Sequence, residues 1–232
     1  MKKTLWIAIA GALAASVIAA SAQEVLSANA VGYIKKTLPA GGKLVAVSLP
    51  LDSMTEADNV FGRTSLAQEM PVNSQVYFWN DINQTWVPGQ KSGKGWQPGE
   101  SNKVIKPGEG FFIQGPKAAA VDTEVTITGE VPPDATISRA ILDNKRLSSL
   151  ANPYPVDFKF GSSDLAAQAP VNSQVYFWNQ ANQTWVAGQK SGKGWQPGES
   201  NRVVQAGEGF FLQQPAAAPA AAWNAAKPYT WP

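Results

Sequence analysis

The chain has 232 residues, with 19 Lys and Arg, 17 Asp and Glu, and neither His nor Cys. The lack of Cys excludes disulfides and thiolate chemistry, and the lack of His removes the commonest general base and the commonest metal ligand. A chain of this length can form one large β domain or two domains of about 100 residues each.

Residues 1–22 have the layout of a secretory signal peptide. Lys2 and Lys3 form a basic start, residues 5–20 are apolar, and Ala20-Ser21-Ala22 supplies a small-residue cleavage site. The apolar run is shorter than the roughly 20 residues that span a bilayer, so we expect cleavage and no membrane span in the mature protein. The sequence therefore predicts an exported bacterial protein, located outside the cell, on the cell surface or in the periplasm.

Loss of Lys2 and Lys3 with this segment leaves 17 basic and 17 acidic residues in the mature protein. A neutral chain lacks the basic patch that nucleic-acid binding requires, so we expect no nucleic-acid partner.

An internal repeat dominates the rest of the chain: residues 71–116 recur almost unchanged as residues 170–215, at a constant offset of 99. Such self-similarity predicts two copies of one structural module. We place the first β module at 23–118, the second at 119–215 and an Ala/Pro-rich tail at 216–232. The predicted fold is all-β, with two tandem antiparallel sandwich-like or barrel-like modules; a single merged sandwich with exchanged strands is the alternative.

β-branched and aromatic runs, separated by Gly, Pro and Asn, predict the strands of the first copy. A capping residue before and a Pro after residues 65–69 predict a short helical turn, as they do for 164–168 in the second copy. The tail either docks as an edge strand or on another molecule, or is disordered. The expected strands cover residues 44–49 upstream of the first copy, 75–80, 85–87, 103–106 and 111–114 within it, and 123–131 between the copies.

Three phrases occur in a fixed order in the second copy: Asn152-Pro153-Tyr154-Pro155, residues 175–179 (VYFWN) and residues 207–211 (GEGFF). They resemble a repeat module of secreted and cell-surface proteins of diderm bacteria, most of them uncharacterised. The resemblance implies a small β-sandwich or barrel, and it carries no specific function.

The aromatic strand 75–80 has two apolar faces, because successive strand residues point to opposite sides. Val76 and Phe78 share one face, while Tyr77 and Trp79 share the other. We therefore expect either burial on both faces or a core on one face and a binding platform on the other.

Trp96 and Trp195 stand apart from these strands, in Gly-rich loops with little local apolar material to cover them. A Trp on such a loop, amid polar side chains, is typical of a surface that stacks on sugar rings. The candidate ligand-binding residues are Trp96, Lys94, Gln97, Glu100 and Asn102 in the first copy, and Trp195, Lys193, Gln196, Glu199 and Asn201 in the second.

Other chemistries fit the sequence less well. The Gly-Lys run 89–95 lacks the spacing and the Ser or Thr of a phosphate-binding loop. Calcium ligands near Asp81 are not repeated, since Gln180 replaces this residue in the second copy. We therefore predict no metal, no cofactor and no enzyme activity.

Our leading hypothesis is a non-enzymatic exported protein whose duplicated modules bind carbohydrate, such as a polysaccharide or surface glycan. The alternative is a structural subunit of an extracellular matrix, envelope or filament that self-associates through edge strands or the tail. A third hypothesis is a glycoside hydrolase that uses paired carboxylates, for which Glu100 with Glu109, or Glu199 with Glu208, are the repeated pairs.

Overall fold

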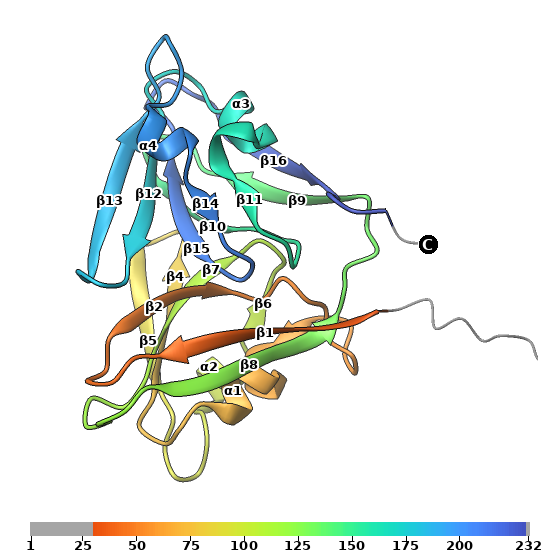
Figure 1. The fold of residues 1–232 in the computed structure, drawn as a ribbon, viewed down its shortest axis with the longest axis vertical. Helices are drawn as coiled ribbons and strands as arrows, with labels where there is room; N and C mark the ends of the chain where they lie inside the picture. Colours follow the sequence, from red (N-terminus) through yellow and green to blue (C-terminus); the bar gives the residue numbers. More distant parts are fainter. Residues whose placement is uncertain (1–29, 231–232) are drawn as a thin grey trace, which may run out of the picture.

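The computed structural model describes residues 30–230, and the predicted signal peptide lies outside this range. Two similar antiparallel β modules follow one another along the chain, and in Figure 1 the second copy lies above the first. The predicted fold class, two tandem β-sandwich modules, is thus confirmed.

Each module contains a four-stranded antiparallel sheet, a two-stranded ribbon and a small two-stranded pair. The sheet of the first module has the order β2-β7-β4-β5, the ribbon pairs β1 with β8, and β3 pairs with β6. The elements of this module are β1 (Val31–Leu38), β2 (Leu44–Ser48), β3 (Asn59–Val60), the 3-10 helix η1 (Phe61–Arg63), α1 (Ser65–Glu69), β4 (Gln75–Asn80), β5 (Thr85–Gln90), α2 (Pro98–Ser101), β6 (Val104–Ile105), β7 (Gly110–Gln114) and β8 (Thr123–Glu130).

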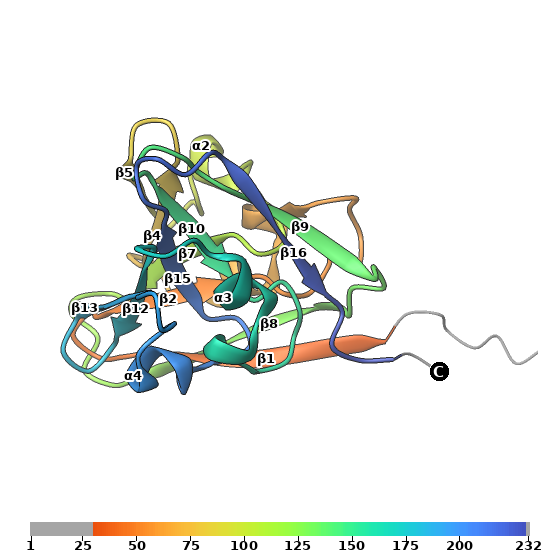
Figure 2. The same cartoon turned by 90° about the horizontal axis from the view of Figure 1, so that it is seen from above.

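The second module repeats this plan with the sheet order β10-β15-β12-β13. Its ribbon pairs β16 with β9, as Figure 2 shows, and β11 pairs with β14. Its elements are β9 (Thr136–Ile141), β10 (Leu147–Ala151), β11 (Phe158–Lys159), the 3-10 helix η2 (Phe160–Ser162), α3 (Asp164–Gln168), β12 (Gln174–Asn179), β13 (Thr184–Gln189), α4 (Pro197–Ser200), β14 (Val203–Val204), β15 (Gly209–Gln213) and β16 (Ala221–Ala226).

Strand pairing divides the chain differently from the expected boundary between residues 118 and 119. β8 lies beyond that boundary, yet it pairs along its whole length with β1 of the first module. The C-terminal tail is likewise part of the second module, because β16 pairs with β9 and buries Trp223. The docked edge strand, one of the two alternatives for the tail, is the one that the structure contains.

Local sequence accounts for the short elements inside the repeat. The predicted helical turns 65–69 and 164–168 are α1 and α3, and each begins with a capped turn. The hydroxyl of Thr64 accepts a hydrogen bond from the Ala67 amide, and that of Ser163 accepts one from Ala166. The β4–β5 hairpin turns through Gln84, whose φ of 52° lies in the left-handed region.

One face of each four-stranded sheet lies on the core of its own module. In β4, Val76 and Phe78 are buried in a cluster with Phe61, Leu66 and Phe111. The ribbon and the short helix close the other side of this core, where the Ser65 hydroxyl bonds to the main chain of β8. The first module is therefore a small sandwich whose second layer is the β1–β8 ribbon with α1.

The other face of each sheet packs on the other module. Phe112 lies 4.9 Å from Trp178 between ring centroids, and Trp79 lies 5.0 Å from Phe211 in the matching contact. Both pairs are edge-to-face, a geometry that adds about 0.5–1.5 kcal/mol beyond the burial of the rings. The aromatic strands thus have one buried face and a second, partly buried face that packs on the other module, which is closer to the first of the two predicted alternatives, burial on both faces.

Hydrogen bonds across this junction are reciprocal. The Gln84 amide nitrogen donates to the Leu147 carbonyl, and its oxygen accepts from the Leu147 amide at 2.6 Å. Gln183 makes the same two bonds with Leu44. Each module therefore contributes the same patch, and the junction has the self-complementary character of a two-fold interface.

Candidate functional site

The two loop tryptophans that the sequence suggests as stacking platforms are used inside the modules. The Trp96 indole N–H donates to the Ala67 carbonyl at 3.0 Å, and its ring meets Phe61 edge-on at 5.0 Å. Trp195 makes the equivalent contacts with Ala166 and Phe160. Both rings are partly buried and pack against the hydrophobic cores.

The polar candidates around these rings do not share one environment. Lys94 and Lys193 are exposed in tight turns closed by main-chain pairs between residues 92 and 95 and between 191 and 194. The other exposed candidates flank or cap the four-residue helices α2 and α4, and these are Gln97, Asn102, Gln196 and Asn201.

Glu100 and Glu199 turn toward the edge strands of the sheets. A Cβ added at Gly89 or Gly188 would overlap the side chain of Glu100 or Glu199, so each glutamate lies directly over its glycine. One carboxylate oxygen of each, Oε2, is buried and has no hydrogen-bond partner among the described residues. Of the predicted candidates, Glu199 is the one that also lines a groove between the two modules.

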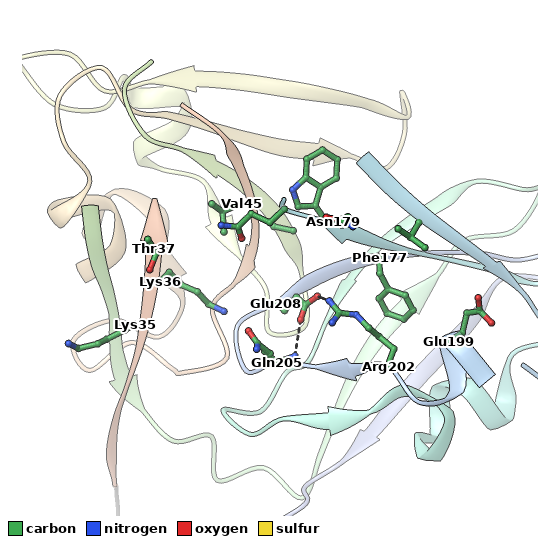
Figure 3. Close-up of a pocket in the computed structure, with 15 residues that line it drawn as sticks. Lys35, Lys36, Thr37, Val45, Phe177, Asn179, Glu199, Arg202, Gln205 and Glu208 are labelled. Carbon is green, nitrogen blue, oxygen red and sulfur yellow. Dashed lines mark hydrogen bonds and ion pairs between the residues drawn. The ribbon is translucent and has the colours of Figure 1, made fainter. Parts of the chain in front are cut away.

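This groove lies where the two modules meet and has a volume of about 700 Å³. The first module lines it with β1 and β2, and the second lines it with β12, β13, α4 and the segment that leads into β15 (Figure 3). Its lining residues are Lys35, Lys36, Thr37, Val45, Ala46, Phe177, Trp178, Asn179, Gln180, Val186, Gly198, Glu199, Arg202, Gln205 and Glu208.

An ion pair stands in the groove beside an aromatic ring. Arg202 pairs with Glu208, and its guanidinium carbon lies 5.5 Å from the centre of the Phe177 ring. Glu208 also accepts a hydrogen bond from the main-chain N–H of Gln205 at 2.9 Å, which holds its carboxylate in place. The pair is thus held from both sides, and Figure 3 shows it facing Lys36.

Lys36 reaches the same place from the first module. Its Nζ donates to the Ala206 carbonyl at 2.8 Å. Burial lowers the pKa of Lys36, while the charges of Glu208 and Asp157 act in the opposite direction. Lys35, next to it in β1, instead pairs with Glu124 at 2.7 Å, and Figure 3 shows its side chain directed away from Lys36. The inner part of the groove therefore combines two cations and one carboxylate with two aromatic rings and three side-chain amides.

Sequence reasoning did not identify this groove. Trp178 belongs to an aromatic strand whose second face was expected to be either core or binding platform, and Lys36 lies outside the repeat. The two apolar faces of strand 75–80 were the one available signal, since they indicated that something covers the second face. Which residues border that covered face depends on how the two modules meet, and no local pattern contains this information.

Within residues 30–230, each helix is too short or too polar to serve as a membrane-spanning segment. Over the same residues, no group of three or more acidic side chains is arranged to hold a metal ion. In comparisons with family models, with curated proteins and with solved structures, nothing matches this chain.

Proposed function

We propose that the chain is an exported, non-enzymatic protein that binds a glycan in the groove between its two modules. The observation that carries this proposal is the groove itself, about 700 Å³ in volume and lined by aromatic, amide and charged side chains. Sites for small polar ligands typically combine ring surfaces with a few polar groups that fix orientation. Asn179, Gln180 and Gln205 are suitable partners for sugar hydroxyls, because side-chain amides both donate and accept hydrogen bonds.

The state of the carboxylates supports binding over catalysis. Glu109 interacts with both Lys103 and Arg139 and accepts from the Lys106 amide, and Glu208 is held by Arg202 and the Gln205 amide. These contacts give both glutamates a structural role in their Gly-Glu-Gly turns.

The groove hypothesis differs from the loop hypothesis in stoichiometry. A groove at the junction gives one site per chain, whereas the repeated loops around Lys94 and Lys193 would give two. Isothermal titration with oligosaccharides chosen from a glycan array measures this number directly. We expect one site per chain.

Two pairs of substitutions locate the site. Gln180 and Gln205 have exposed side chains in the groove, so Gln180→Ala with Gln205→Ala is expected to weaken binding about tenfold or more without unfolding the module. The matched control is Lys193→Ala with Gln196→Ala in the loop, which leaves the groove intact. If the control pair abolishes binding and the groove pair does not, the site is on the loop and the groove proposal is wrong.

Self-assembly is the second candidate function, and the open edges of the two sheets favour it. β5 and β13 are edge strands, and they expose Val87 (46%) and Val186 (51%). Unpaired edges are templates for association with another chain, and a Lys on the edge prevents it. Sedimentation of the wild type and of the double variant Val87→Lys with Val186→Lys tests this function. Oligomers of the wild type that are absent in the variant would support it, and a monomeric wild type would reject it.

A further inference from the structure

The groove has a counterpart on the other side of the pseudo-two-fold junction. Lys36 in β1 lies against the Gly207–Glu208 turn of the second module, and Arg139 in β9 lies against the Gly108–Glu109 turn of the first. The same main-chain contact accompanies both. The Ser48 amide donates to Gly207 at 3.1 Å, and the Ala151 amide donates to Gly108 at 2.9 Å.

In this counterpart, acidic and basic side chains of the two modules face one another. Glu109 is 9% exposed and lies 3.8 Å from Arg139, which is 13% exposed, and 3.4 Å from Lys103. Asp81 brings a second carboxylate to the cluster. Burial raises the pKa of Asp81, and the neighbouring Arg139 has the largest opposing effect. Arg146 also acts on Asp81, but it forms its own ion pair with Asp143. The remaining two acidic and two basic side chains balance one another there.

The open groove differs from this cluster in charge at the position of Asp81. The duplication places Gln180 where the first copy has Asp81, while Arg202 matches Lys103 and Glu208 matches Glu109. Glu199 and Glu100 are common to both copies and do not change the comparison. Lys106 and Gln205 differ as well, but Lys106 is exposed and is not among the charges that act on Asp81.

The part of the groove around Lys36 and Arg202 thus retains both cations of the cluster, while Gln180 replaces one of its two carboxylates. Glu199 also lines the groove, but Figure 3 shows it on the other side of Phe177, away from Lys36 and Glu208. Asp157 acts on Lys36 too, but it accepts from the Ala206 main-chain amide and is not one of the groove-lining residues. A half-buried cation pair with one adjacent carboxylate favours a ligand that brings a negative charge.

We propose that the groove binds a carboxylated glycan, one that contains uronic acid, whose carboxylate lies beside Lys36 and Arg202 as Asp81 lies beside Arg139 in the first copy. This inference rests on the proposed glycan-binding function and adds the chemical class of the ligand. The amides of Gln180 and Gln205 then contact the sugar hydroxyls, and the carboxylate supplies the charge.

The first test compares two ligands with the same backbone. Oligogalacturonate carries a carboxylate on each sugar, and its methyl ester is uncharged. Titration calorimetry of the full mature chain is expected to give a dissociation constant for the ester that is about tenfold or more above that for the acid. Affinity for the acid is also expected to fall as salt is raised, because the groove is open to solvent.

The second test introduces the missing carboxylate into the groove. Gln180→Asp recreates the residue that the first copy carries in the same hairpin, so the turn accommodates it. The carboxylate that this substitution introduces repels the carboxylate of the ligand. Two controls add no charge to the groove. Gln180→Asn places there a neutral side chain with the shape of aspartate, and Asp81→Gln changes the other cluster.

We expect Gln180→Asp to bind oligogalacturonate about tenfold or more weakly than Gln180→Asn, which shortens the side chain equally but adds no charge. Asp81→Gln, outside the groove, is expected to stay within about threefold of the wild type. Equal binding of acid and ester, with no effect of Gln180→Asp, would overturn this inference and leave the glycan-binding function standing. Failure of every oligosaccharide to bind would overturn the proposed function and this inference with it. Binding of poly-glutamate but of no oligosaccharide would likewise overturn both, since it would identify an acidic peptide as the ligand.

Discussion

Trp178 donates its indole hydrogen to the main-chain oxygen of Leu44, 3.1 Å away in the other module. Trp79 makes the equivalent contact with Leu147 at 3.2 Å. Leu44 and Leu147 are the first residues of β2 and β10, which are edge strands. The edge strand of each module therefore contacts the aromatic face of the other module's sheet. The duplication therefore preserves a surface that is complementary to itself, and the second module covers the face that the first leaves open.

Trp178→Phe tests whether this junction stabilises the whole chain. Phenylalanine keeps a ring against Phe112 but loses the hydrogen bond to Leu44 and part of the buried area. We expect the free energy of unfolding to fall by about 1–3 kcal/mol, with one cooperative transition in urea. Trp79→Phe is the matched variant and should have a similar effect. Separate transitions for two modules, with only one of them shifted, would contradict this account of the junction.

Lys91 caps the end of α1 with its ammonium group. Its Nζ lies 2.9, 2.7 and 2.7 Å from the carbonyl oxygens of Ala67, Gln68 and Met70. Lys91→Met removes this donor from the Gln68 and Met70 carbonyls, while the Ala67 carbonyl keeps the Trp96 N–H. It is expected to lower the free energy of unfolding by about 1–3 kcal/mol.

Two further variants make the Lys91 test specific. Lys91→Arg is expected to restore little, because a planar guanidinium cannot place three donors around one point. Lys94→Met is the control, since Lys94 is exposed, and its effect should stay within about 0.5 kcal/mol. Equal effects of Lys91→Met and Lys94→Met in urea unfolding would refute the capping role.

The sequence could predict the elements inside the repeat because their signals are local. β4 and β12 follow from β-branched and aromatic runs, and α1 and α3 follow from a capping residue before them. The ribbon strands β1 and β9 were not identified. They lie outside the repeat, and the residues that they pair with in β8 and β16 are 80–99 positions away along the chain.

The candidate site was harder to predict, because burial depends on distant residues. Trp96 looked exposed from its Gly-rich neighbours, yet Phe61 and Ala67, about 30 residues earlier, receive its ring and its N–H group. Lys36 enters the groove only because the two modules meet at a two-fold junction. A pattern within one copy cannot reveal a surface that two copies build together.

Gly89 is required by the side chain that lies over it. A Cβ at this position would overlap Cγ of Glu100, whereas Cβ of Glu100 would be 3.1 Å away. Gly89→Ala is therefore expected to lower the free energy of unfolding by about 1–3 kcal/mol by displacing Glu100 from the sheet. Truncation to Glu100→Ala removes the overlapping atoms, so the double variant should lose less than the sum of the single ones. A double-mutant cycle in urea measures this coupling, and strict additivity would show that the two residues are independent.

Tyr229 makes the docked C-terminal segment sensitive to alkaline pH. Its hydroxyl donates to the Pro132 carbonyl at 3.0 Å and its ring meets Tyr154 at 5.7 Å, and burial raises the pKa of Tyr229 to about 12. The folded protein therefore keeps a proton that the unfolded chain releases near pH 10, so this stabilisation is complete below about pH 10 and is lost as the pH rises toward about 12. Tyr229→Phe has no proton to release, and its free energy of unfolding should fall less steeply over this interval than that of the wild type. Urea unfolding at a series of pH values, with tyrosinate absorbance to follow ionisation, makes the comparison, and identical slopes for the two proteins would show that Tyr229 does not contribute.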